Sequence, residues 1–393
     1  MHEPNYTGLE SLLESFLNHK ILNYEKTRNF SFSGKDTLKN VSGLSPYISR
    51  GLLKEKRLLK KVLGLKKKSD KFIQEIFWRI YWQGWLENHS GVWENYKNSI
   101  KELEENNYEI DKNYKEAITA STTIDPFNDW VNILKSTGYL HNHVRMWFAS
   151  IWIFYLGVPW QLGAKFFYEN LLDRDVASNL LSWRWVAGLQ TKGKRYIASE
   201  DNINKYTFNK YRGLKLPKLV NIEHTDQIDE ISIINYNTLE KNYDDCAVLI
   251  NENNLNEDLL FHLNNKIKVL IFVKYRIKNL NTSITVHDFQ KKLIEEFKKK
   301  YISNKIYFKE IYLPDETDNF INILKKYSIK NIVFDYLRCG YEKDILLDTL
   351  NKLNQSIIIN EVLDNFYLNS WEHCFRGFFK FKEKIPILLK ELS

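Results

Sequence analysis

The sequence predicts an α-helical domain followed by an α/β domain with a doubly wound, Rossmann-like parallel sheet. Of the eleven tryptophans, ten lie between Trp78 and Trp185, and only Trp371 lies beyond. Residues 1–220 carry 33 Lys and Arg against 23 Asp and Glu, whereas residues 221–393 carry 24 against 26. Helical periodicity in the first part gives way to short β-branched runs in the second. We therefore divide the chain into domains 1–220 and 221–393, since a chain of 393 residues is too long to fold around one ordinary hydrophobic core.

The composition excludes several classes of protein. No run of about 18 apolar residues is present and the first residues do not resemble a signal peptide, so we expect a cytoplasmic protein without a membrane partner. Cys246, Cys339 and Cys374 lie far apart, which excludes a disulfide framework, and we expect no metal site. The basic first domain suits a polyanion such as DNA, although an AT-rich genome also enriches lysine.

In the first domain, apolar residues recur at helical spacing over residues 8–22, 69–88 and 127–156. Polar stretches at 29–43 and 119–128 predict loops between these helices. The composition changes again over residues 212–227, which we interpret as the linker between the domains.

Beyond the linker, five near-continuous apolar runs predict strands, at residues 246–252, 267–275, 305–313, 330–337 and 355–363. Amphipathic patterns between them predict helices at residues 286–301, 317–328 and 342–354. Such alternation indicates a parallel sheet covered on both faces. Neither a GxGxxG nor a GxxxxGK[ST] motif accompanies these strands, which argues against a standard dinucleotide or P-loop site.

Several short motifs in the helical domain have both a structural and a functional interpretation. Ser45 before Pro46 predicts a capped helix start, which can also bind an anion. Glu75 and Arg79 lie one helical turn apart, and a surface ion pair is the simpler interpretation. The cation of Arg145 precedes a very apolar helix and needs a carboxylate partner, which residues 173–175 can supply.

The stretch DRDVASNLLSWRWVAG places carboxylates, an amide and indoles close together. Trp183 and Trp185 would face opposite sides of a helix, so that one points inward and the other toward a cleft. The amide of Asn179 can donate to or accept from a heteroaromatic ring. A bulky planar cofactor between Asp173, Asp175 and the indoles explains this combination better than packing does.

Six stretches in series resemble the FAD-binding domain of the photolyase/cryptochrome family. They are YEKTR, VSGLSPY, EIFWRIY, STGYLHNHVRM, DRDVASN and WRWVAG, and they cover residues 24 to 188 nearly collinearly. The resemblance implies FAD as cofactor. By position, the residues that would bind it are Tyr24, Ser42, Leu44, Ser45, Glu75, Arg79, Asn142, Arg145, Asp173, Asp175 and Asn179.

The resemblance further implies a blue-light-driven DNA repair lyase that splits cyclobutane pyrimidine dimers by electron transfer from reduced FAD. Its catalytic positions are Glu75, Trp78, Asn142, Met146, Asn179 and Trp185, and the DNA-binding ones are Arg28, Trp78 and Trp185. Trp78 and Trp185 would sandwich the flipped dimer; photolyases are an established example of base flipping. Electrons would reach the flavin through Trp183 and Trp160, while Tyr108, Trp152 and Tyr155 stay open as outer donors.

Some features depart from the family pattern. His143 stands where repair enzymes often have Arg, and Leu180 and Leu181 replace a usual Asn and small residue. The α/β domain follows the helical one, whereas in the family it precedes it, so we interpret the order as a circular permutation. An antenna chromophore of folate or deazaflavin type is left open.

Two alternatives remain. A cryptochrome-like photoreceptor would bind the same flavin and signal through a protein partner. A DNA-binding protein on a retired photolyase scaffold would hold no flavin.

Overall fold

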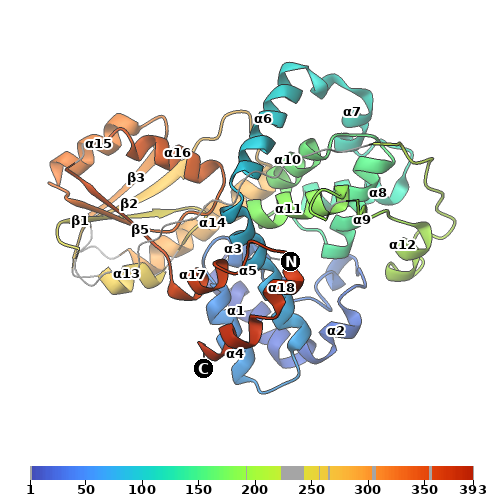
Figure 1. The fold of residues 1–393 in the computed structure, drawn as a ribbon, viewed down its shortest axis with the longest axis horizontal. Coiled ribbons are helices and arrows are strands. Elements are labelled where there is room, and N and C mark those ends of the chain that lie inside the picture. Colours follow the sequence, from blue (N-terminus) through green and yellow to red (C-terminus); the bar gives the residue numbers. More distant parts are fainter. Residues whose placement is uncertain are drawn as a thin grey trace.

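The computed structural model describes residues 2–191, 193–222, 243–255, 257–263, 266–302, 307–353 and 356–392. Figure 1 shows the helical part on the right and the sheet with its helices on the left. The expected linker, 212–227, extends beyond residue 222 and so lies partly outside the described residues. The division of the chain at residue 220 stays a prediction.

The helical part begins with α1 and ends with α12. Its α-helices are α1 (Tyr6–Ser15), α2 (Tyr24–Thr27), α3 (Ser45–Ser49), α4 (Glu55–Gly64), α5 (Asp70–Asn88), α6 (Gly91–Glu105), α7 (Lys112–Thr119), α8 (Asp125–Thr137), α9 (Asn142–Phe154), α10 (Trp160–Asn170), α11 (Val176–Ala187) and α12 (Glu200–Tyr206). Shorter helical turns are η1 (Phe16–Lys20), η2 (Ile21–Asn23), η3 (Gly34–Asp36) and η4 (Tyr108–Ile110).

The helical stretch expected at residues 127–156 is two helices, α8 and α9, and a new helix after Gly138 is what the sequence predicts. Gly138 ends α8 in the left-handed conformation, with φ of 65°, where glycine carries no steric penalty. The next helix starts four residues later, and the side chain of His141 caps it by accepting a hydrogen bond from the backbone N–H of His143. This turn places the start of α9 close to the start of α11, on which it packs.

The predicted α/β arrangement is confirmed. The strands are β1 (Cys246–Asn251), β2 (Ile267–Tyr275), β3 (Tyr307–Leu313), β4 (Asn331–Asp335) and β5 (Ile358–Val362). They form one parallel sheet in the order β3-β2-β1-β4-β5, with Val248 paired to Leu270 on one side and to Val333 on the other. The helices between them are α13 (Glu257–Leu263), α14 (Ile284–Tyr301), α15 (Thr317–Lys326) and α16 (Tyr341–Leu350); the sequence patterns did not predict α13.

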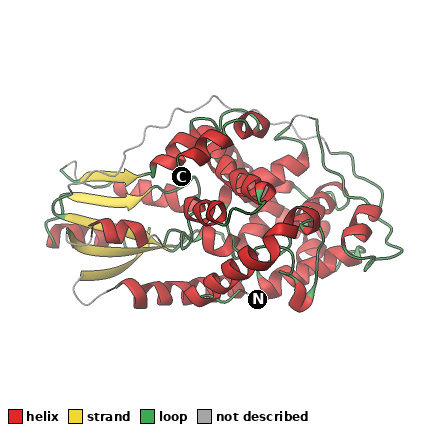
Figure 2. Ribbon diagram, turned by 90° about the horizontal axis from the view of Figure 1, so that it is seen from below, coloured by secondary structure: helices red, strands yellow, loops and turns green. Residues whose placement is uncertain are grey.

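Both faces of the sheet are covered, as the continuous apolar runs predicted. Val248 and Ile250 of β1 point into the core that includes α13 and α14, whereas Ala247 and Leu249 point into a separate core under α15 and α16. Figure 2 shows the strands with helices on either side. The chain reverses direction across the sheet between β1 and β4, so their carboxyl ends form the crevice in which such folds place ligands.

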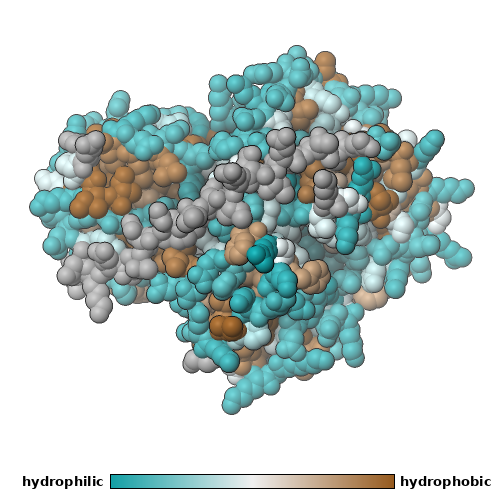
Figure 3. All heavy atoms as spheres, viewed as in Figure 1, coloured by the Kyte–Doolittle hydropathy of each residue, from teal (hydrophilic) through white to brown (hydrophobic). Residues whose placement is uncertain are grey.

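The chain returns to the helical part after β5. Three short helices, α17 (Asn365–Trp371), α18 (Phe378–Lys382) and α19 (Ile385–Lys390), follow the last strand. In Figure 1 these red helices lie beside the blue helices α1, α4 and α5, and both α17 and α18 pack on α5. The space-filling view shows a mostly hydrophilic face with apolar side chains gathered over the sheet (Figure 3). Within the described ranges, no helix has the length and apolarity required to cross a membrane.

Gly84 of α5 allows the C-terminal helices to approach. A Cβ atom at this position would lie 2.5 Å from the ring of Trp371 in α17. Gly84→Ala should therefore lower the free energy of unfolding in urea by about 1–3 kcal/mol, as overpacked cores do. Gly64→Ala is the matched control, because nothing lies within 4 Å of the corresponding Cβ. Equal stability of the two variants would contradict this packing.

Candidate functional site

The ion pair that the sequence predicted for Arg145 forms with Asp173. Its guanidinium donates to Asp173 Oδ2 at 2.9 Å and through Nε to the backbone oxygen of Leu140 at 3.0 Å. Asp173 is buried, which by itself raises the pKa of the carboxyl, but the charge and hydrogen bond of Arg145 outweigh burial and lower it. Arg79 and the hydroxyl of Ser45, at the start of α3, lower the pKa of this carboxyl further.

Arg79 of α5 does not pair with Glu75, so the ion pair proposed between them is wrong. Glu75 instead contacts Arg28 at 3.1 Å on the outer side of the helix. The guanidinium of Arg79 points inward, where it donates to Asp175 Oδ2 at 2.7 Å and to Ser49 Oγ at 3.0 Å. The two residues of the predicted surface pair, although one helical turn apart, therefore bind different partners.

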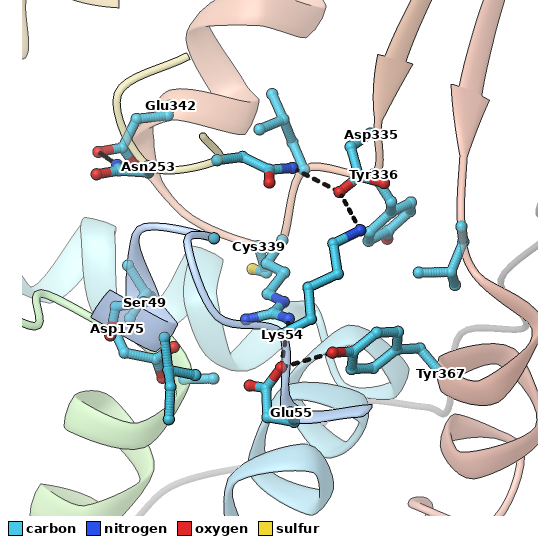
Figure 4. Close-up of a pocket in the computed structure, with 18 of the residues that line it drawn as sticks. Ser49, Lys54, Glu55, Asp175, Asn253, Asp335, Tyr336, Cys339, Glu342 and Tyr367 are labelled. Atoms are coloured by element: carbon cyan, nitrogen blue, oxygen red, sulfur yellow. Dashed lines mark hydrogen bonds and ion pairs between the residues drawn. The ribbon is translucent and has the colours of Figure 1, made fainter. Parts of the chain in front are cut away.

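Glu55, the first residue of α4, is the second carboxylate on Arg79 and is 1 % exposed. Glu55 Oε1 accepts from Arg79 Nε at 2.9 Å and from the amide of Gln83 at 3.1 Å. Glu55 Oε2 accepts from the hydroxyl of Tyr367 in α17 at 2.6 Å, and Arg338, after β4, lies 3.6 Å away. Figure 4 shows Glu55 and Tyr367 facing each other at the lower edge of a pocket that both residues line.

The electrostatic state of Glu55 follows from these donors. Burial raises the pKa of the carboxyl, but the guanidiniums of Arg338 and Arg79 and the hydroxyl of Tyr367 more than compensate and lower it to about 2. The pocket beside Glu55 has a volume of about 100 Å³ and lies between α3, α11 and the carboxyl ends of β1 and β4. Its polar side chains are largely paired across the two parts, as with Lys54 and Asp335 at 3.0 Å.

Asn179 and Trp183 lie one turn apart on α11 and each carries a buried polar atom without a partner. The amide nitrogen of Asn179 donates to the backbone oxygen of Ala164 at 2.8 Å, while its Oδ1 has no donor among the described residues. The indole N–H of Trp183 is likewise unpaired in the described part of the chain. Such groups each cost about 1–3 kcal/mol when they stay unsatisfied, which indicates a polar ligand on this face.

These side chains can be compared with FAD, the cofactor that the resemblance implies. The unpartnered acceptor of Asn179 and the Arg145–Asp173 pair at the start of the same helix suit the polar edge of a flavin ring. Ser42 and Ser45 flank Leu44, where α3 begins; Leu44 lies at the capping position, one residue before the Ser cap that the sequence predicted. The residues present therefore fit the cofactor.

Tyr24 and His2 belong to the N-terminal segment, which lies next to the candidate flavin site. The ring of Tyr24 packs edge-on against Phe16 and Phe72. A ring nitrogen of His2 lies 3.0 Å from the backbone oxygen of Gly43, and its other nitrogen is buried with no hydrogen-bond partner among the described residues. Burial lowers the pKa of His2 to about 4, so the ring is neutral at neutral pH. The sequence analysis did not identify His2.

The five residues expected to contact a pyrimidine dimer come from three helices that pack together, α5, α9 and α11. Asn142 is exposed, and the other four are partly exposed: Glu75, Trp78, Met146 and Trp185. Both indoles already contact rings of the chain. Trp78 is stacked on Phe378 of α18, with centroids 3.5 Å apart and planes 10° apart, and Trp185 is stacked on Tyr196 at 5.5 Å. The sandwich of a dimer between the two indoles stays a prediction.

Trp183 and Trp160 lie inside the helical core. The ring of Trp183 is 2 % exposed and fits against α10 because residue 163 is glycine; a Cβ there would lie 2.3 Å from the indole. Its indole neighbour is Trp152, with ring centroids 6.0 Å apart, and Tyr114 lies a further 6.0 Å from Trp152. Trp160 lies 6.0 Å from Tyr96. The roles of these residues in electron transfer stay predictions.

Glu55 is not among the site residues expected from the sequence, although one signal in the sequence indicates it. Leu58, Leu59 and Val62 are the buried stripe of α4, and Glu55 precedes them by three, four and seven residues on the same face. A carboxylate on an apolar stripe needs buried donors.

Residues 72–212 match the family model described as the FAD binding domain of DNA photolyase. A deoxyribodipyrimidine photo-lyase of Agrobacterium fabrum is 30% identical over 191 residues, which are 47% of this chain and 38% of that protein. Cryptochrome-1 of Arabidopsis thaliana is 25% identical over 222 residues, 53% of this chain and 31% of that protein. The chain thus spans less than half the length of these relatives.

Among solved structures, the crystal structure of a bacterial class III photolyase from Agrobacterium tumefaciens is similar with a TM-score of 0.43 and 27% identity. The match covers 51% of this chain and 42% of that one.

The depressed pKa of Glu55 predicts how stability responds to acid. The unfolded carboxyl takes up a proton near pH 4.5, whereas the folded one stays ionised down to about 2. The unfolded state therefore binds more protons in this window, so the contribution of Glu55, up to about 3 kcal/mol, is present above about pH 5 and is lost as the pH falls.

We expect the difference in urea unfolding free energy between wild type and Glu55→Gln to shrink from about pH 7 to about pH 3. Glu105→Gln, at an exposed position, is the control and should change stability by less than about 0.5 kcal/mol throughout. A wild-type minus Glu55→Gln difference that does not change with pH would contradict the prediction.

Proposed function

We propose that the protein is a photolyase/cryptochrome-family flavoprotein that splits cyclobutane pyrimidine dimers in DNA under blue light. The proposal is supported by the match of residues 72–212 to the FAD binding domain of DNA photolyase and by the photolyase and cryptochrome relatives. The observation that carries the proposal is the set Glu75, Trp78, Asn142, Met146 and Trp185. Their side chains are exposed or partly exposed on α5, α9 and α11, and both α5 and α9 pack on α11. A purely structural role would not require that two indoles, a carboxylate, an amide and a thioether all be exposed or partly exposed.

The cofactor is proposed to be FAD, bound between the start of α3 and the inner face of α11. When bound and reduced, FAD supplies the excited-state electron that opens the cyclobutane ring. Arg145 and Asp173 orient one edge of the site, and the acceptor of Asn179 faces it from α11. An amide at this position cannot act as an acid toward the cofactor, which suits retention of an anionic reduced form.

The DNA partner is proposed to bind over the exposed ends of α5 and α9. Arg28, ion-paired with Glu75, is placed to contact a phosphate, and the positive balance of residues 1–220 adds sequence-independent attraction. The carboxylate of Glu75 can hydrogen-bond the edge of an extruded base. The indole of Trp185 can stack on it, at about 1–3 kcal/mol per base.

The remaining expectations for the α/β part stay predictions, because the matched residues, 72–212, end before the first strand. They are the circular permutation and the antenna pigment of folate or deazaflavin type. A cytoplasmic location also belongs to the proposal.

A cryptochrome-like photoreceptor is the second candidate, and the stacking of Phe378 on Trp78 favours it. One face of an indole expected to contact the lesion is covered by a ring of the chain itself. Beside it on the C-terminal segment, Phe379 is 79% exposed and offers an apolar contact to a protein partner. In this case light would change partner binding and no dimers would be lost.

Illumination of the reduced protein with a dimer-containing oligonucleotide tests the proposal. We expect loss of dimers under blue light, and we expect Trp185→Ala to weaken oligonucleotide binding at least about fivefold because a stacking surface is removed. Phe261→Ala is the control, since this exposed ring lies on α13 in the α/β part.

Each outcome decides between the candidates. Bound FAD with no loss of dimers rejects repair and favours the photoreceptor, and a colourless preparation that takes up no FAD rejects both. Equal binding by the Trp185 and Phe261 variants contradicts the assigned stacking surface.

A further inference from the structure

Arg79 is held between two carboxylates that belong to different regions of the fold. Nε donates to Glu55 of α4, and a terminal nitrogen donates to Asp175 at the start of α11. The side chain of Arg79 is 14% exposed, and those of Glu55 and Asp175 are 1% and 9% exposed. Charged hydrogen bonds in such a setting are short, directional and little screened by solvent.

Asp175 connects Arg79 to the helix that carries the flavin-facing residues. Its Oδ1 accepts from the backbone N–H of Ser178 at 2.7 Å and so caps α11, while its Oδ2 binds Arg79. Asn179, Trp183 and Trp185 all project from the turns that follow. A shift of the Arg79 guanidinium therefore shifts the start of α11.

Glu55 is in turn fixed by the other part of the molecule. Tyr367 of α17 donates to it at 2.6 Å and Arg338, in the loop after β4, lies at 3.6 Å. Figure 4 shows Tyr367 approaching Glu55 from the C-terminal helices, with Asp175 on the opposite side of the pocket. Glu55 thus contacts cationic or donor side chains from three places: α17, the loop after β4, and α5.

We propose that Glu55 is a positioning residue for the flavin site, through which the docked α/β part and C-terminal helices set the orientation of α11. This inference rests on the proposed function, because the site that Glu55 orients is the one proposed to bind FAD. Glu55 touches neither flavin nor DNA in this scheme; it acts through Arg79 and Asp175.

Glu87 provides a matched control within the same interface. It is also a buried carboxylate, 5% exposed, at the other end of α5. It accepts from the hydroxyl of Tyr336 at 2.7 Å and the backbone N–H of Cys339 at 2.6 Å, in the same loop that carries Arg338. Among the described residues, the hydrogen bonds and ion pair of Glu87 are made with Tyr336, Cys339 and Lys343 and not with Arg79 or Asp175. Its loss should therefore weaken the interface without acting on α11.

The experiment compares full-length wild type, Glu55→Gln, Tyr367→Phe and Glu87→Gln after removal of bound flavin. Titration with FAD gives the Kd, visible circular dichroism of the bound flavin reports its surroundings, and hydrogen exchange reports opening of residues 176–187. We expect Glu55→Gln to raise the Kd at least about tenfold, with altered flavin dichroism and faster exchange in α11. Tyr367→Phe, which removes one hydroxyl, should raise the Kd about threefold. Glu87→Gln should stay within about twofold of wild type.

Equal effects of Glu55→Gln and Glu87→Gln on the Kd and on α11 exchange overturn the inference, because a general loosening of the interface then explains both. If Glu55→Gln does not fold, the single-hydroxyl variant Tyr367→Phe decides by the same comparison. If wild type takes up no FAD, the proposed function fails. Hydrogen exchange of α11 then still tests the role of Glu55. Faster exchange in Glu55→Gln, but not in Glu87→Gln, supports the positioning of α11 by Glu55, and unchanged exchange contradicts it.

Discussion

The carboxylate of Glu55 is the constraint on which the arrangement of the two parts depends. A charge buried this deeply is tolerated only when donors surround it, and those donors come from α5, from the loop after β4 and from α17. The three elements are separated by up to about 300 residues in the chain. Their side chains can satisfy Glu55 together only when the sheet and the C-terminal helices are docked in one orientation.

Buried polar groups at the interface contribute specificity more than net stability. Replacing an ion pair of this kind by apolar side chains is often neutral, whereas removing one partner leaves an uncompensated charge. Glu55 and Glu87 both contact groups in the loop between β4 and α16. A shift of that loop would therefore remove partners from two buried carboxylates.

Sequence patterns predict the parts of the fold that depend on local periodicity. The five strands and the pairing of Arg145 with Asp173 follow from apolar runs and from the need of a buried cation for a carboxylate. The return of α17 and α18 to α5, and of Tyr367 to Glu55 across 312 positions, depends on long-range contacts that no local pattern encodes. Phe378 on Trp78 was missed for the same reason.

The path of the chain has a consequence for its biosynthesis. The long helix α5 forms early, yet the groups that cover its far side, among them Trp371 and Phe378, belong to the last 30 residues of the sequence. Until those residues leave the ribosome, Trp78 and the surface beside Gly84 stay uncovered in the nascent chain. Such exposed aromatic surface is what chaperones bind during translation. The helical core is therefore completed only after the whole α/β part has been made, although α5 itself precedes that part in the chain.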